Sequence, residues 1–207
     1  MNISGYSADI WILGSSIIQR ASDHVKLRPT GSHLGFDKSG FNVTWIGYGG
    51  LRWHSVEIII WNLLAVAFPP KYLIIHCGGN DIPLIPNGDL IFQIKRYITN
   101  ISLMLPNTTI IWSDIMPRSN WRFAIDNSAV DLTRIRINRA IRIFVQKLGG
   151  KVIMHRDFDD QHTSLFDSDG VHLSYIGNDI FINELQSALE MFISRPYRMT
   201  YPEEIVN

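Results

Sequence analysis

Short, continuous apolar runs alternate along this chain with longer segments whose apolar residues recur at helical spacing. The runs are too short for helices and predict buried strands, at 10–13, 41–46, 72–77, 107–114 and 151–155. Helical patterns follow them, at 16–27, 52–67, 89–104, 129–148 and 175–194. Strands that are apolar throughout and separated by helices predict an α/β fold, with a five-stranded parallel sheet covered by helices on both faces.

Length and composition favour one globular domain. The 207 residues fit a single domain, 1–207, and 195–207, rich in Pro and Tyr, is predicted to be a surface tail. Nineteen basic and nineteen acidic residues give a formal net charge of zero, so direct nucleic-acid binding is not expected. Cys77 is the single cysteine, which excludes an internal disulfide framework and a cysteine-rich metal site. No residues show metal-ligand spacing, and no cofactor is predicted.

The sequence predicts an intracellular location, most simply the cytoplasm. No apolar run approaches the roughly 18 residues that span a bilayer, and the N-terminus lacks a basic region followed by an apolar one. The first predicted strand begins within ten residues of Met1. This abrupt start is compatible with a natural beginning and also with a domain of a longer polypeptide.

The turn after the first predicted strand, Gly14-Ser15-Ser16, opens a helix. A helix N-terminus presents unpaired backbone N–H groups that can hold a developing negative charge, so a serine here is a candidate nucleophile. Capping of the helix by one of the hydroxyls is the simpler alternative. This segment alone leaves both alternatives open.

His172 is the candidate base that would activate such a serine. Asp169 lies three residues earlier, across Gly170 and Val171, and a turn can bring its carboxylate back to the imidazole. Asp167 is a rival for the same role. An ordinary surface-loop histidine is the alternative for His172 considered by itself.

Gly50 and Asn80 follow the second and third predicted strands and are candidate oxyanion donors. An acyl-transfer oxyanion needs converging N–H groups, which the Ser16 and Gly50 amides and the Asn80 side chain can offer. Turn geometry and a helix cap are the alternative explanations.

Together these segments resemble the SGNH hydrolases, also called the GDSL esterase/lipase family. The matching blocks, which span 9 to about 190, are Gly14-Ser15-Ser16, Gly47-Tyr48-Gly49-Gly50, Gly78-Gly79-Asn80-Asp81 and Asp169-Gly170-Val171-His172-Leu173-Ser174. The resemblance implies a three-layer α/β/α, flavodoxin-like fold with five parallel strands. It implies a metal-free serine hydrolase that cleaves carboxylic esters of small molecules or lipids, with a short acyl group such as acetyl as the first substrate guess.

The same resemblance implies a role for each site residue. Ser16 would be the nucleophile, His172 the base and Asp169 its orienter, with Gly50 and Asn80 as oxyanion donors beside the Ser16 amide. One position departs from the family pattern, because Ser15 stands where the family has aspartate. Ser15 is therefore the fallback nucleophile, and a weak or inactive enzyme stays open.

A finer similarity links the chain to SGNH domains of vertebrate transposable-element polyproteins. It depends on SDIMPRSNWR, the helix near Asn138, Gly149-Gly150 and DGVHLS. It implies a domain that works beside neighbouring modules of a longer polyprotein and does not itself bind nucleic acid. A non-catalytic binding or scaffold module with the same fold is the competing function.

Two interpretations remain open for three residues after the fourth predicted strand. Arg118, Trp121 and Arg122 either border the pocket and hold an anionic or aromatic part of a substrate, or belong to a surface loop with one packed tryptophan.

Overall fold

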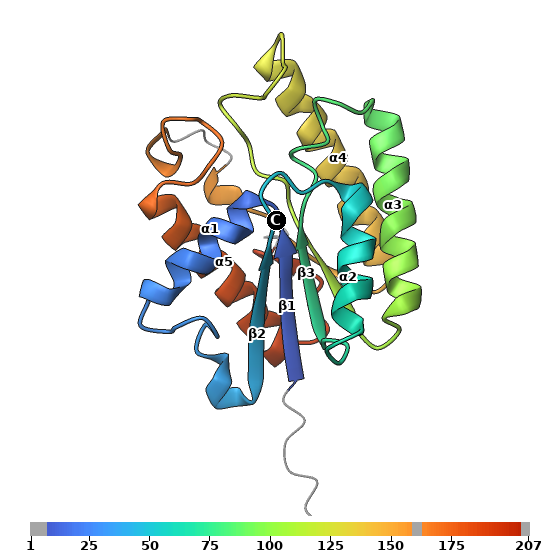
Figure 1. Ribbon diagram of the computed structural model, residues 1–207, viewed down its shortest axis with the longest axis vertical. Coiled ribbons are helices and arrows are strands. Elements are labelled where there is room, and N and C mark those ends of the chain that lie inside the picture. Colours follow the sequence, from blue (N-terminus) through green and yellow to red (C-terminus); the bar gives the residue numbers. More distant parts are fainter. Residues whose placement is uncertain (1–7, 159–162, 204–207) are drawn as a thin grey trace, which may run out of the picture.

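A computed structural model describes residues 8–158 and 163–203, which form one six-stranded parallel sheet (Figure 1). In chain order, the strands are β1 Ala8–Gly14, β2 Phe41–Gly47, β3 Tyr72–His76, β4 Thr109–Ser113, β5 Lys151–Ile153 and β6 Thr200–Tyr201. Their order across the sheet is β2-β1-β3-β4-β5-β6, and every adjacent pair is parallel. The first five strands therefore follow the flavodoxin-like order.

The predicted parallel α/β architecture is confirmed, but the predicted count of five strands is wrong. The sixth strand, β6, comes from the segment expected to be a surface tail. The amides of Val152 in β5 and of Met154 just after it donate to the Met199 and Tyr201 carbonyls. The Lys151 ammonium also donates to carbonyls of this segment, at 2.6 and 2.7 Å. The backbone after the last helix is thereby held against the sheet, and 204–207 lie outside the described residues.

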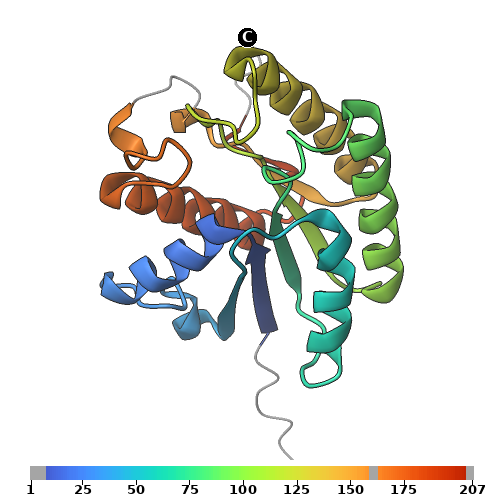
Figure 2. The same cartoon turned by 45° about the horizontal axis from the view of Figure 1, so that its top comes forward.

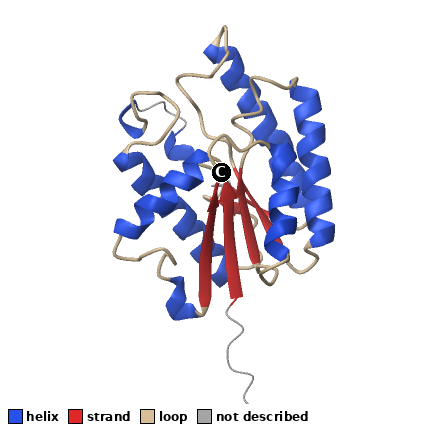
Figure 3. Cartoon of the chain, viewed as in Figure 1, coloured by secondary structure: helices blue, strands red, loops and turns tan. Residues whose placement is uncertain are grey.

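Five α-helices cover the sheet in two layers (Figures 1 and 3). They are α1 Ser16–His24 and α5 Tyr175–Ser194 on one face, and α2 Val56–Leu64, α3 Asn87–Met104 and α4 Asn127–Lys147 on the other. Short 3₁₀ turns occupy Val25–Leu27, Phe36–Ser39, Trp53–Ser55, Arg156–Phe158 and Thr163–Leu165.

Alternate side chains of the central strands enter two separate cores. On β1, Trp11 and Leu13 pack toward α2, α3 and α4, whereas Ile10 and Ile12 pack toward α1 and α5. Burial on both faces explains why these strands are apolar throughout. The edge strand β2 instead alternates buried and more exposed residues along most of its length.

The topology creates a switch point between β1 and β3. After β1 the chain passes through α1 to β2 on one side, and it later returns to β3 on the other side of β1. The connections that leave β1 and β3 therefore diverge, and a crevice at the carboxyl ends of such strands is the usual ligand site of this fold class. The first turn of α1 begins at this edge, at the arrowhead of β1 (Figure 2).

Gly14 holds the β1 turn against both neighbouring strands. Its carbonyl accepts a hydrogen bond from the Tyr48 amide at 3.0 Å, and the Ser15 amide donates to the His76 carbonyl at 3.4 Å. A Cβ atom at Gly14 would lie 2.4 Å from the same His76 carbonyl oxygen. Only glycine permits this approach without a backbone shift.

We predict that Gly14→Ala lowers the free energy of unfolding by about 1–3 kcal/mol, because the added methyl group overpacks a rigid backbone contact. Urea denaturation measures the change. The matched control is Gly88→Ala in α3, where a Cβ meets nothing within 4 Å and should be neutral or slightly stabilising. Equal stability of Gly14→Ala and wild type would refute the close contact.

Candidate active site

The turn between β1 and α1 directs the Ser16 hydroxyl toward the last loop before α5. Ser15 occupies the N-cap position with extended backbone, and within the described part of the chain its side chain makes no capping hydrogen bond. Ser16 is the first residue of α1, and its Oγ lies 2.9 Å from His172 Nε2. The hydroxyl is therefore paired with an imidazole instead of capping the helix.

The loop before α5 is folded tightly enough to fix His172. Asp169 Oδ1 accepts hydrogen bonds from the Val171 and His172 amides, both at 2.9 Å. Its Oδ2 lies 2.5 Å from His172 Nδ1. Gly170 adopts the left-handed conformation (φ +66°) that this reversal requires. The three-residue spacing thus brings the carboxylate to the ring.

The two candidate orienters have different partners. Asp169 contacts His172, whereas Asp167 forms an ion pair with Arg20 at 2.7 Å. Partial burial raises the pKa of Asp169, but hydrogen bonds from the His172 ring and from the His172 and Val171 amides outweigh it and hold the pKa well below its ordinary value. The carboxylate is therefore ionised and accepts a hydrogen bond from Nδ1–H. Nε2 then presents its lone pair to the Ser16 hydroxyl.

Gly50 and Asn80 lie together on the wall of a small cavity of about 100 Å³. Gly50 has a left-handed backbone (φ +71°). The Asn80 amide is oriented from both ends: Nδ2 donates to the Leu51 carbonyl at 3.1 Å, and Oδ1 accepts from Arg118 Nη2 at 3.3 Å. One Nδ2 hydrogen of Asn80 remains for a further acceptor.

Ser16 and His172 do not line that cavity, but shared residues connect it to their turn. Gly79 and Arg118 border it and also border a narrower cavity lined by Ser15 and Ile17. The structure thus joins Ser16, His172 and Asp169 by hydrogen bonds, and it brings Gly50 and Asn80 together on one cavity wall.

Asp81, next to Asn80, is a buried carboxyl with one partner. Oδ1 accepts from the Trp53 amide at 3.3 Å, and Oδ2 has no hydrogen-bond partner among the described residues. Burial raises the pKa of Asp81 to about 6, against the opposing effects of the Trp53 amide and the Arg52 charge.

A second chain of Ser, His and carboxylate groups lies in the interior. Ser113 Oγ is 2.7 Å from His155 Nε2, and His155 Nδ1 is 2.5 Å from Glu184 Oε2. His76 Nδ1 extends the chain to Ser113 at 2.9 Å. Ser113 is fully buried, so this hydroxyl cannot meet a substrate. Sequence reasoning missed this chain, although polar residues at the ends of the apolar runs at β3 and β4 mark two of its members.

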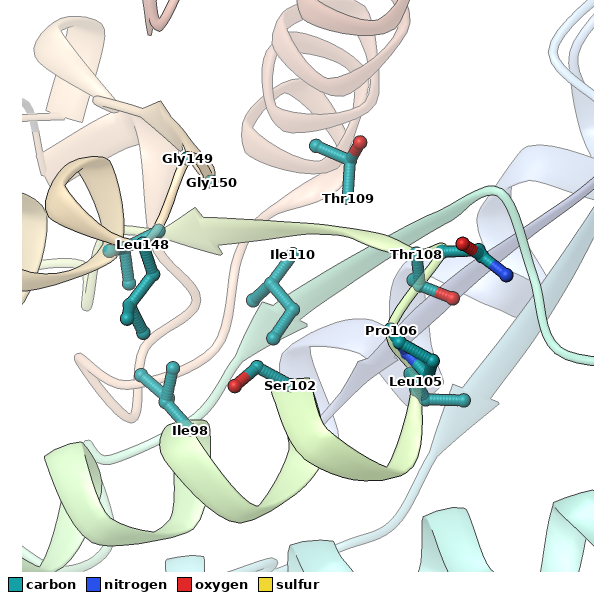
Figure 4. Close-up of a pocket in the computed structure, with 12 residues that line it drawn as sticks. Ile98, Ser102, Leu105, Pro106, Thr108, Thr109, Ile110, Leu148, Gly149 and Gly150 are labelled. Atoms are coloured by element: carbon teal, nitrogen blue, oxygen red, sulfur yellow. The ribbon is translucent and has the colours of Figure 1, made fainter.

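A cavity of about 350 Å³ lies at the opposite end of the sheet (Figure 4). Its lining includes Thr109 at the start of β4 and Gly150 just before β5. None of the predicted site residues lines it. The candidate chemistry therefore belongs to the carboxyl edge and not to this cavity.

The sequence matches no protein-family model and no curated protein, but many solved structures share the fold. One is a lipolytic protein of the G-D-S-L family from Veillonella parvula, which is 20% identical in sequence. The match covers 90% of this chain and 98% of that chain, with a TM-score of 0.66. Another is a psychrotrophic esterase from Pseudoalteromonas, inhibited by monoethylphosphonate, with 12% identity, coverage of 90% and 99%, and a TM-score of 0.68. The chain has the GDSL hydrolase fold. This confirms the fold that the resemblance implied.

A mutant of an acetyl-xylooligosaccharide esterase from Geobacillus also shares the fold, with 15% identity, coverage of 90% and 95%, and a TM-score of 0.63.

Residues 8–158 and 163–203 contain neither a candidate membrane-spanning helix nor a candidate metal site. These residues contain no helix of the length and apolarity that a membrane span needs. Nor, within the same ranges, do three or more His, Cys, Asp or Glu side chains come together in a group placed to hold a metal ion.

The raised pKa of Asp81 predicts a pH-dependent stability. The folded state binds this proton more tightly than the unfolded chain, so the stabilisation is complete below about pH 4 and is lost as pH rises through about 6. Asparagine at position 81 has no carboxyl group to ionise, so the Asp81→Asn variant does not lose stability in this way as the pH rises. We expect the unfolding free energy of the variant, relative to wild type, to rise by about 1–3 kcal/mol between pH 4 and pH 7.5.

Urea denaturation at the two pH values measures this difference. Asp89→Asn, at an exposed position of α3, controls for the loss of a carboxylate. An Asp81→Asn difference from wild type that is the same at both pH values would contradict a buried carboxyl with a raised pKa.

Proposed function

We propose that this protein is a serine hydrolase that cleaves carboxylic esters, with Ser16 as nucleophile, His172 as general base and Asp169 as its orienter. The observation that carries the proposal is the continuous hydrogen-bond chain from Ser16 Oγ through His172 to Asp169, at the carboxyl edge of a parallel sheet. The esterases among the structures that share the fold support the same reaction class.

The first half of the proposed reaction forms an acyl-enzyme. His172 Nε2 takes the Ser16 hydroxyl proton as Oγ attacks the ester carbonyl carbon, and Asp169 stabilises the imidazolium that forms. The tetrahedral intermediate collapses, the C–O bond to the alcohol breaks, and the imidazolium protonates the leaving oxygen. In the second half, His172 takes a proton from water, which attacks the acyl carbon. The acid leaves, and the proton returns to Ser16.

Three N–H donors are proposed for the oxyanion: the Ser16 amide, the Gly50 amide and Asn80 Nδ2. The Ser16 amide opens α1, where helix geometry leaves N–H groups without intrahelical acceptors. Gly50 and Asn80 share a cavity wall, and the contacts of Asn80 with Leu51 and Arg118 fix its amide in advance. Donors that are held before reaction stabilise developing charge without a reorganisation cost.

The finer assignments follow from the same site. The proposed scheme requires no metal or cofactor, because serine, imidazole and N–H donors supply each step. A short acyl group such as acetyl is proposed for the substrate, supported by an acetyl-xylooligosaccharide esterase among the structural neighbours. Ser15 in place of the family aspartate is compatible with this scheme, since Ser16 Oγ and not Ser15 Oγ contacts His172.

The competing proposal is a catalytically weak or inactive module within a larger transposable-element protein. Its support is the sequence similarity around SDIMPRSNWR and DGVHLS. The cytoplasmic location likewise stays a prediction from the sequence. Ester hydrolysis decides between the enzyme and the inactive module.

We predict that Ser16→Ala lowers kcat/KM for p-nitrophenyl acetate by at least about 10³-fold, because the nucleophile is lost. Release of p-nitrophenolate measures the rate. Ser15→Ala and Ser113→Ala leave the Ser16 and His172 pair in place and should stay within about tenfold of wild type. Equal background hydrolysis by wild type and Ser16→Ala would overturn the proposed function and leave the inactive module.

A further inference from the structure

Three arginines line the cavity that Gly50 and Asn80 share. Arg52, Arg118 and Arg122 line it, and no acidic residue of the described ranges does. Its volume of about 100 Å³ suits a group of carboxylate or phosphate size and not a long acyl chain. The cavity is therefore small, cationic and adjacent to the proposed oxyanion donors.

Arg118 is the arginine of this cavity whose side chain is held in place by its surroundings. Its side chain is only 9% exposed, and the guanidinium lies 5.0 Å from the centre of the Trp121 ring. Gly79 lies against the guanidinium, since a Cβ there would sit 2.6 Å from Nη2. The glycine in the Gly78-Gly79-Asn80-Asp81 turn thus makes room for an arginine packed against a tryptophan.

Arg118 is also a buried cation without a carboxylate partner in the described part of the chain. Its guanidinium donates to the neutral Asn80 Oδ1, at 3.3 Å. Burial lowers the pKa of Arg118 to about 10, against the opposing charges of Asp169 and Cys77, so the guanidinium remains charged at neutral pH. An unpaired buried charge is costly to the fold, and a bound anion would relieve that cost.

Arg134, which is buried, and Arg142, which is half-buried, are both paired with a carboxylate. Arg134 donates from Nε and Nη2 to the two oxygens of Asp131, and Arg142 donates in the same way to Asp114. Asp169, the acid that acts electrostatically on Arg118, hydrogen-bonds His172 and two backbone amides. The Arg118 donors that do not bind Asn80 are thus left for a ligand, and a guanidinium suits bidentate recognition of a carboxylate or phosphate.

Arg122 and Arg52 surround the same cavity from more exposed positions. The Arg122 guanidinium lies 5.0 Å from the centre of the Phe123 ring. Phe123 adopts a left-handed backbone (φ +68°), which is rare for an aromatic residue and points to a local constraint in this loop. Arg52 acts electrostatically on the buried Asp81.

We infer that the substrate of this site is an anionic ester, whose carboxylate or phosphate lies within a few bonds of the scissile carbonyl and pairs with Arg118, Arg122 and Arg52. This inference rests on the proposed function. Asn80 links the two groups of such a substrate. It lines the cavity, its Nδ2 is a proposed oxyanion donor, and its Oδ1 accepts a hydrogen bond from Arg118. The anionic group therefore lies beside the reacting carbonyl. This assigns to Arg118 and Arg122 the substrate-binding interpretation that the sequence left open.

Matched pairs of esters test the inference. 4-Acetoxybenzoate and its methyl ester place or remove a carboxylate on the alcohol side, and monomethyl and dimethyl succinate do so on the acyl side. We expect wild type to show a kcat/KM at least about tenfold higher for the anionic member of one pair. Arg118→Met should reduce this anionic-to-neutral ratio about tenfold, and Arg122→Gln should reduce it less.

Arg136→Gln removes the same charge from an exposed position of α4 and should leave the ratio unchanged. Arg122→Gln, at an exposed position, keeps the test decisive if Arg118→Met does not fold. If Arg118 only positions Asn80, Arg118→Met lowers both rates together and the ratio stays constant, which overturns the inference. A wild-type ratio near or below one in both pairs also overturns it, while the proposed hydrolase stands.

Failure of the proposed function gives a different result, because wild type then hydrolyses none of the esters faster than Ser16→Ala. In that case, isothermal titration calorimetry measures the binding of 4-hydroxybenzoate and of succinate, which tests the anion site independently of hydrolysis. Binding of either anion to wild type that is lost in Arg118→Met supports the site. Absence of binding to wild type overturns it.

Discussion

The close contact between the ends of β1 and β3 is the constraint on which the site depends. Gly14 lies beside His76 in the sheet register, and the missing side chain allows the Ser15 amide to reach the His76 carbonyl. That contact sets where α1 begins and so where Ser16 faces the α5 loop. The same strand, β3, continues into Gly79 and Asn80, so one backbone junction positions the hydroxyl and the candidate oxyanion donor together.

Desolvation explains why the buried polar groups of this fold differ in role. The chain from Glu184 through His155 and Ser113 to His76 joins α5 to the segment after β5 and to strands β4 and β3, and each member has a hydrogen-bond partner. Burial, with the His155 and Arg118 charges, holds the pKa of His76 well below its ordinary value, so that ring is neutral. Arg118 is also buried but has only the neutral amide of Asn80 among the described residues. A satisfied chain stabilises the interior, whereas the unused donors of Arg118 are the basis of the proposed anion site.

The sequence predicts the parts of the fold that repeat or lie close in the chain. Continuous apolar strands require burial on both faces, and the short Asp169 to His172 spacing permits one local turn, so both could be anticipated. The Thr200–Tyr201 strand is too short to carry a pattern, and Lys151 holds it through tertiary contacts. The members of the interior chain come from α5, β4, β3 and the segment after β5, and no local spacing relates them. The pairing of Asp167 with Arg20 also depends on tertiary structure.

Covalent labelling tests the central claim, that Ser16 is the hydroxyl activated by the site. A fluorophosphonate reacts with an activated serine Oγ, forms an O–P bond and releases fluoride, and peptide mass spectrometry locates the adduct. We expect one adduct per chain, on the peptide that contains Ser16. The label should be absent from Ser16→Ala and retained in Ser15→Ala. No adduct on wild type, or an adduct of equal yield on Ser16→Ala, would contradict it.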